Sequence, residues 1–206
     1  EGPLGVNFID DLDVSSEGKI YFSEASHKYD LRNLKADIIE HGANGRLLQY
    51  NVETKNTKVL LDGLQFANGI ALGPNDRYLL VNETGAYRIT KYWLKGGRAG
   101  EHETFIRNLP GMPDNISYNG AGIFWVALYT PRNTLLDSMA PHPFLRKVVY
   151  RLPNWVQPAA KTYAFVLGVD DKGKVRYNLQ NGASDAYAPI TSADQLNETL
   201  YMGSLT

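Results

Sequence analysis

A strand, turn and strand unit that recurs four times is the feature that most constrains how this chain folds. Each unit joins a short strand, through a polar turn, to a second strand rich in β-branched and aromatic residues, which is typical of β-hairpins. The four units span residues 10–23, 68–81, 114–127 and 190–203. Repeats spaced by a few tens of residues indicate a solenoid, a propeller or another repeat architecture.

Further predicted strands follow the first three units, at residues 46–50, 58–61, 88–93, 103–106, 147–151 and 163–167. Four strands per repeat, Gly-containing turns and few helical patterns favour a β-propeller, in which each repeat forms one blade. An immunoglobulin-like sandwich is the alternative, but its strands need not share one register. We therefore predict an all-β chain built as a β-propeller.

The repeat also predicts where the blades lie. We expect them at about residues 8–64, 66–109 and 112–170, with the start of another at 187–206. A propeller ring closes with about 4 to 8 blades. We therefore expect residues 1–206 to form a single β-propeller domain that is incomplete at both ends, with about three and a half blades.

Two stretches interrupt the repeat, at residues 27–45 and 131–146, and such insertions are expected to lie at a blade's rim, where they can cap the axial mouth. Between Pro143 and Pro153, apolar residues recur at helical spacing. A short amphipathic helix is therefore favoured over the strand at 147–151. We expect this helix to roof a pocket.

Composition excludes several classes of function. The chain has 206 residues with 21 Lys and Arg against 22 Asp and Glu, a formal charge of -1. That balance argues against binding to nucleic acid or to a membrane surface. The chain has no cysteine, which excludes disulfides, a thiolate nucleophile and Cys-ligated zinc. No apolar run reaches about 18 residues, so we expect no direct membrane insertion by this segment. The partner that we expect is a small-molecule substrate.

Polar residues occupy the same position in three of the four units. These residues are Asp10, Asn68 and Asp114, whereas the fourth unit has Ile190. The first strand of each propeller blade lines the central channel, so the three side chains are expected to converge there. Their oxygens suit Ca²⁺ or another hard divalent cation. The alternative is that Asn68 and Asp114 open turns.

Three further acidic or amide residues are weaker candidates for the site. Asp11 and Asn115 directly follow the axial positions and are candidates for additional metal ligands or for groups that support the ligands. Glu83 follows a predicted strand end, where its carboxylate either faces the channel mouth or begins a solvated loop. No Gly-x-Ser-x-Gly or phosphate-binding glycine pattern is present.

A series of short sequence words occurs in a specific order, at residues 7–12, 45–50, 66–72, 83–84, 88–93, 109–116, 144–147 and 200–205. Together they resemble the strictosidine synthase family and its strictosidine-synthase-like relatives, including the adipocyte plasma membrane-associated proteins. The resemblance implies a six-bladed propeller with a short capping helix. The wider superfamily includes calcium-dependent lactonases such as paraoxonases and gluconolactonases.

The resemblance also implies roles for individual residues. Positions matching Asp10, Asn68 and Asp114, with Asn115 adjacent, hold the axial metal in the superfamily, together with a Glu of the first blade that is expected upstream. Strictosidine synthase condenses an amine with an aldehyde by using a Glu, and that position is Thr191 in this chain. A hydroxyl cannot accept a proton from an ammonium as a carboxylate does, so this activity is disfavoured.

Three hypotheses follow for the function. The first is a metal-dependent hydrolase of small esters or lactones at the axial pocket. The second is a strictosidine synthase-type condensation, for which Glu83 is the only carboxylate candidate to test. The third is a non-catalytic propeller that binds a ligand or a protein. A secretory, periplasmic or membrane-anchored location, the last through an upstream N-terminal segment, stays open.

Overall fold

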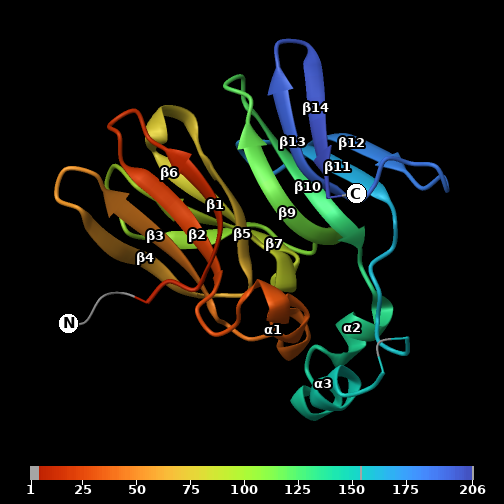
Figure 1. Cartoon of the computed structure of the whole chain (residues 1–206). Helices are drawn as coiled ribbons and strands as arrows, with labels where there is room; N and C mark the ends of the chain where they lie inside the picture. Colours follow the sequence, from red (N-terminus) through yellow and green to blue (C-terminus); the bar gives the residue numbers. More distant parts are fainter. Residues whose placement is uncertain (1–4, 154, 206) are drawn as a thin grey trace.

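The computed structural model describes residues 5–153 and 155–205. Its described strands form three four-stranded antiparallel sheets and one two-stranded hairpin. The sheets follow one another in chain order, and the helices gather at one end of them (Figure 1). This arrangement confirms the all-β prediction and the four recurring hairpins.

The first sheet has the order β1-β2-β3-β4. Its strands are β1 (Phe8–Val14), β2 (Ile20–Ser26), β3 (Gly45–Asn51) and β4 (Asn56–Leu64). Strand β2 is almost entirely buried, as expected for a central strand that carries the apolar and β-branched residues of its hairpin.

The second sheet repeats this plan as β5-β6-β7-β8. Its strands are β5 (Ala67–Leu72), β6 (Tyr78–Glu83), β7 (Arg88–Trp93) and β8 (His102–Ile106). Both β5 and β6 are buried along their whole length. Continuous burial of this kind requires packing on both faces, which the neighbouring sheets provide.

The third sheet, in the order β9-β10-β11-β12, extends further along the chain than predicted. Its strands are β9 (Gly111–Tyr118), β10 (Ile123–Pro131), β11 (Ala164–Asp170) and β12 (Val175–Asn181). The predicted third blade ended at residue 170 and omitted β12. Because residues 147–151 are helical, β12 supplies the fourth strand instead. Strands β13 (Ile190–Leu196) and β14 (Thr199–Ser204) complete the chain as a hairpin.

The hydrophobic core lies between successive sheets. One cluster joins the second and third sheets, with Leu80, Phe124 and Leu167 among its members. A second cluster joins the first and second sheets through Leu47 and Val81. Fully burying such side chains stabilises the fold by about 1.5–3 kcal/mol each. The sheets are therefore fixed face to face, as the blades of a propeller are.

The two insertions contain the helices. The first forms the short 3₁₀ turn η1 (Leu31–Asn33) and α1 (Leu34–Glu40), and the second forms α2 (Thr134–Met139) and α3 (Pro143–Tyr150). The helix predicted between the two prolines is thus confirmed. No helix in the described part of the chain is long and apolar enough to cross a membrane.

Carboxylates of β1 join the first sheet to the second. Asp11 Oδ2 accepts a hydrogen bond from the Ile70 backbone N–H at 2.9 Å, and Asp13 Oδ2 accepts one from Leu72 N–H at 2.8 Å. At this edge of β5, side chains replace the backbone ladder that joins strands within a sheet.

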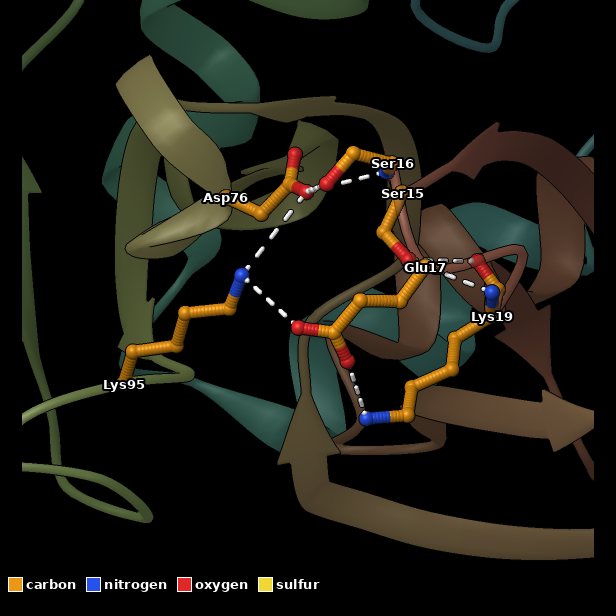
Figure 2. A network of polar contacts seen from close by, with 6 residues as sticks. All are labelled: Ser15, Ser16, Glu17, Lys19, Asp76 and Lys95. Carbon is orange, nitrogen blue, oxygen red and sulfur yellow. Dashed lines mark hydrogen bonds and ion pairs between the residues drawn. The ribbon is translucent and has the colours of Figure 1, made fainter.

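A network of polar contacts lies at the other end of these inner strands, where β1 turns into β2 and β5 turns into β6 through η2 (Pro74–Asp76). Figure 2 shows this turn network, which consists of Ser15, Ser16, Glu17, Lys19, Asp76 and Lys95. Asp76 Oδ2 accepts from Ser16 Oγ at 2.5 Å and from Ser16 N at 2.9 Å. Glu17 pairs with Lys19 at 2.7 Å and with Lys95 at 3.0 Å.

Candidate functional site

A cavity of about 680 Å³ opens between the ends of the inner strands and the two insertions. Most of its wall is apolar, with contributions from the sheets and from helices α1 and α2. The apolar lining residues are Phe8, Ile9, Leu31, Leu34, Ile38, Ile39, Phe66, Met112, Pro131, Leu136, Pro158, Ala159, Ala160 and Leu205. A volume of this size accommodates a small organic molecule.

The insertions cap this cavity as predicted, but the helix expected to roof it does not. Residues of α1, from the first insertion, and of α2, from the second, line the wall, whereas no residue of α3 does. Helix α3 instead packs beside α1 and α2. The apolar spacing correctly indicated a helix, but spacing alone does not state which surface that helix covers.

The three predicted axial residues, Asp10, Asn68 and Asp114, all line the cavity, and we call them the axial cluster. They lie in the inner strands β1, β5 and β9, so neither Asn68 nor Asp114 opens a turn. A glycine allows these strands to meet. A Cβ added to Gly69 would lie 2.4 Å from Asn115 Cα, which no side chain permits. Gly69 is therefore required for the close approach of β5 to β9.

The electrostatic environment of the axial cluster opposes negative charge. Burial, followed by the charge of Asp10, raises the pKa of Asp114 to about 7, although a hydrogen bond from Asn68 acts in the opposite direction. Burial, followed by the charge of Asp11, raises the pKa of Asp10 to about 6. Asp10 is open to solvent through the cavity but still loses part of its hydration. Among the described residues, no basic side chain forms an ion pair with Asp10 or Asp114.

Asn68 has an oxygen atom with no hydrogen-bond donor. Its side chain is 7% exposed, its amide donates to Asp114, and its Oδ1 is buried without a partner among the described residues. A buried unpaired oxygen is costly and calls for an explanation, such as an ion. An amide oxygen beside two carboxylates is a donor set that suits a hard cation.

The ligand set within this chain is partial. The described residues contain no group of three His, Cys, Asp or Glu side chains that could hold a metal ion. The axial cluster offers two carboxylates and one amide oxygen, whereas Ca²⁺ takes about 6 to 8 oxygen ligands. Further oxygens would have to come from water, substrate or other parts of the protein.

Asp11 and Asn115 do not line the cavity. The Asp11 carboxylate is already hydrogen-bonded to the backbone of Ile70 and of Leu12. Its effect on the axial cluster is electrostatic, because its charge raises the pKa of both Asp10 and Asp114. Asn115 contributes its backbone to the close approach at Gly69.

Glu83 faces neither the channel mouth nor a solvated loop. It is fully buried, and both carboxylate oxygens are paired with Arg88, at 2.6 and 2.7 Å. Thr90 Oγ1 and the Gln65 N–H donate to the same carboxylate. Because its hydrogen-bonding capacity is used in this way and it does not line the cavity, Glu83 stabilises the end of β6 rather than meeting a substrate.

The other positions singled out from the sequence also lie outside the cavity. Thr191 is on β13, where its hydroxyl donates to the Gly203 carbonyl oxygen at 3.4 Å. In the described part of the chain, neither Thr191 nor any of the four histidines contributes to the cavity wall. The structure therefore provides no free carboxylate at either position considered for amine chemistry.

Several polar residues line the cavity that were not predicted from the sequence, because no motif marks them. They are Lys35, Thr84, Tyr129, Thr130, Arg132, Asn133, Thr134 and Lys161. Most of them flank or lie within the insertions, at the ends of second strands. That position is the only signal from which they could have been found.

The family model and the similar proteins point to the same family. The family model described as strictosidine synthase matches residues 10–97. The adipocyte plasma membrane-associated protein of Rattus norvegicus is 35% identical over 97% of this chain and 55% of its own length. The strictosidine synthase-like 13 protein of Arabidopsis thaliana is 39% identical over 84% of this chain and 44% of its own length. The chain thus spans about half the length of the curated relatives it matches.

Solved structures match the fold. A gluconolactonase of Xanthomonas campestris has a TM-score of 0.61 at 18% identity, covering 97% of this chain and 55% of that protein. Regucalcin of Agrobacterium tumefaciens, a calcium-binding protein, has a TM-score of 0.53 at 15% identity, covering 82% of this chain and 44% of that protein. The sheets described above therefore correspond to about half of a six-bladed propeller.

Proposed function

Because the chain belongs to the strictosidine synthase family, whose fold is shared with lactonases, we propose that it contributes to a metal-dependent hydrolase. The substrates would be small esters or lactones bound in the cavity. The axial cluster would hold Ca²⁺ or another hard divalent cation. The proposal concerns the full-length protein, since this chain spans about half the length of its relatives.

The observation that carries the proposal is the unpaired oxygen of Asn68 beside two partly desolvated carboxylates. Folding alone would favour a hydrogen-bond donor or a positive side chain at this position, as at Glu83. A cation satisfies all three groups at once, whereas a water molecule leaves the like charges unbalanced.

The chain's own residues supply binding and orientation. Asp10, Asn68 and Asp114 would hold the cation, and when bound it would polarise a substrate carbonyl and stabilise negative charge on its oxygen. The apolar wall, including Phe66 and Met112, binds the hydrocarbon part of a substrate and excludes water around it.

The test is a calcium titration of the full-length protein, with thermal melts and a screen of lactones and aryl esters with and without chelator. We expect calcium to raise the melting temperature and to be required for hydrolysis. Asp114→Asn should abolish both effects, whereas Asp185→Asn, at an exposed position outside the cavity, should preserve them. If chelation changes neither quantity, the metal-hydrolase proposal is wrong.

The titration also separates the other two hypotheses. If calcium raises the melting temperature but no ester or lactone is hydrolysed, the protein is a binding propeller with a structural ion. The condensation hypothesis requires a carboxylate near the bound amine, whereas Glu83 is paired and Thr191 lies outside the cavity. A condensation product formed equally by wild type and Glu83→Gln would exclude Glu83 from that reaction.

A further inference from the structure

We infer that this cavity selects an anionic amphiphile, meaning a ligand with an apolar body and a carboxylate or sulfonate group that Lys35 and Lys161 bind. The inference deepens the proposed function, because it names the class of ester or lactone. Its binding part can nevertheless be tested without catalysis.

Charges of opposite sign occupy different parts of the cavity wall. The acidic residues Asp10 and Asp114 lie on inner strands, whereas the basic residue Lys35 lies in the first insertion and Lys161 in the segment that precedes β11. The pKa values of both acids are raised by burial and by neighbouring carboxylates, with no contribution from either lysine. The lysine charges are therefore not neutralised by the axial cluster.

Lys35, in the first insertion, lines the cavity. It shares the lined side of η1 and α1 with Leu31, Leu34 and Ile38, which recur at helical spacing. The acids of this insertion already have partners. Asp30 pairs with Arg32, Glu40 with Lys28, and Asp37 accepts from Ser26 and Asn44. Among the described residues, no carboxylate lies within ion-pair distance of Lys35.

Lys161 reaches the cavity from the segment that precedes β11. Its backbone N–H donates to Thr130 Oγ1 at 2.9 Å, which fixes that segment to the end of β10. The sequence from Ser138 to Val169 contains no Asp or Glu, although it includes Arg146, Lys147, Arg151 and Lys161. Among the described residues, no carboxylate lies within ion-pair distance of Lys161 either, so its positive charge is available to attract an anion.

Arg132, the third basic lining residue, already has partners within the protein. Its Nε donates to Asp137 Oδ2 at 2.8 Å, and its guanidinium lies 4.2 Å above the Tyr87 ring. The two lysines are thus the available cations of the wall. A neutral apolar ligand would fill the cavity but leave both unmatched, whereas an amphiphile with an anionic group contacts the apolar wall and the lysines together.

The experiment uses the full-length protein and two matched pairs of probes. The first pair is an aryl ester of a dicarboxylic acid, with its second carboxylate free or as a neutral methyl ester. The second pair is 8-anilinonaphthalene-1-sulfonate and the uncharged N-phenyl-1-naphthylamine, measured by fluorescence in the presence of chelator. We expect the anionic member of each pair to be favoured about tenfold, as KM or Kd, since charge-assisted hydrogen bonds are strong.

Variants assign this preference to the two lysines. The double variant Lys35→Gln, Lys161→Gln should reduce it to about twofold or less, and raised salt should weaken it. Lys147→Gln, at an exposed position of α3 outside the cavity, should keep it. Equal binding of the charged and neutral probes, or an unchanged preference in the double variant, would overturn the inference. Selective sulfonate binding without any ester hydrolysis would instead contradict the proposed reaction and leave the inference intact.

Discussion

The two ends of the inner strands differ in whether their charged groups are paired. At the turn network, Lys95 bridges Glu17 and Asp76, and Glu17 also pairs with Lys19 (Figure 2). At the cavity end, Asp10 and Asp114 repel each other, and no described residue donates a hydrogen bond to the Asn68 side-chain oxygen. Both ends belong to the same sheets and arise from the same repeat.

The polar groups that serve folding are the paired ones. Paired charges at the turns are what a stable protein tolerates at its surface, with small net effects. Like charges that are partly desolvated reduce stability, and folding gives no reason to retain them. Strained or costly polar arrangements cluster at functional sites, so the cavity end is where a ligand is expected to act.

The largest effect on stability is expected from Glu83→Gln. This variant tests whether a buried carboxylate near the cavity end stabilises the fold when it is paired. Removing the charge leaves Arg88 without its partner, and we expect the free energy of unfolding to fall by about 3 kcal/mol. Urea denaturation measures the loss. The double variant Glu83→Gln, Arg88→Met should recover part of it, and a stabilised Glu83→Gln would contradict the comparison.

Gly69→Ala tests the spacing that brings the axial cluster together. The new Cβ would lie 2.4 Å from Asn115 Cα and 2.6 Å from Ile116 N, so β5 and β9 must separate. We expect a loss of up to about 3 kcal/mol in stability and a weaker thermal shift with calcium. Gly97→Ala, where nothing lies within 4 Å of the new Cβ, is the matched control in the same melts. Equal behaviour of the two variants would show that the approach is not tight.

Asp114→Asn should stabilise the metal-free protein, whereas the two preceding variants should destabilise it. Burial and the charge of Asp10 raise the pKa of Asp114 from 3.8 to about 7, so its ionisation opposes folding near neutral pH. The variant should be more stable by on the order of 2 kcal/mol at pH 7 in chelator.

The same shift sets a pH dependence in chelator. A carboxyl whose folded pKa is raised contributes stability below its unfolded pKa, and this contribution is lost as pH rises to its folded pKa. The stability of the wild type relative to Asp114→Asn should therefore fall between about pH 4 and pH 7. Thermal melts of both proteins across this range measure it. Parallel pH profiles would show that Asp114 ionises freely.

The smallest effect is expected at the turn network. Lys95→Met removes the contacts with Glu17 and Asp76. Lys95 and Glu17 are 42% and 48% exposed and therefore screened by solvent, and the contact with the less exposed Asp76 is long, at 3.9 Å. We expect the melting temperature to change by less than about 2 °C, and by less still at high salt. A larger change in these melts would mean that the ion pairs of the turn network contribute more to stability than their exposure indicates.

The fold was predictable where the repeat is regular. Short runs of β-branched and aromatic residues in β2, β6 and β10 mark buried strands because each hairpin packs between sheets. Strand β12 was not predicted, because the predicted third blade ends at residue 170 and the helix favoured at residues 147–151 leaves that blade one strand short. Its alternation of Val175, Tyr177 and Leu179 is visible in the sequence, but every residue of it is exposed.

The site was predictable only along the axis. Shared register brought Asp10, Asn68 and Asp114 into one cavity, as expected, and their proposed role as metal ligands stays a prediction. Register carries no information on the first insertion or on the segment before β11, so Lys35 and Lys161 were not predicted as lining residues. The pairing of Glu83 with Arg88 was also missed, although a similar pair, Glu24 with Arg46, occupies the first sheet.

The carboxylates of Asp11 and Asp13 also have a consequence for solubility. Strand β5 forms the inner edge of its sheet, and exposed edges with free N–H groups recruit strands from other molecules. Because the two aspartates accept from Ile70 and Leu72, they occupy the positions at which a foreign strand would pair. The two aspartates on this edge thus protect the folded protein against aggregation through strand pairing.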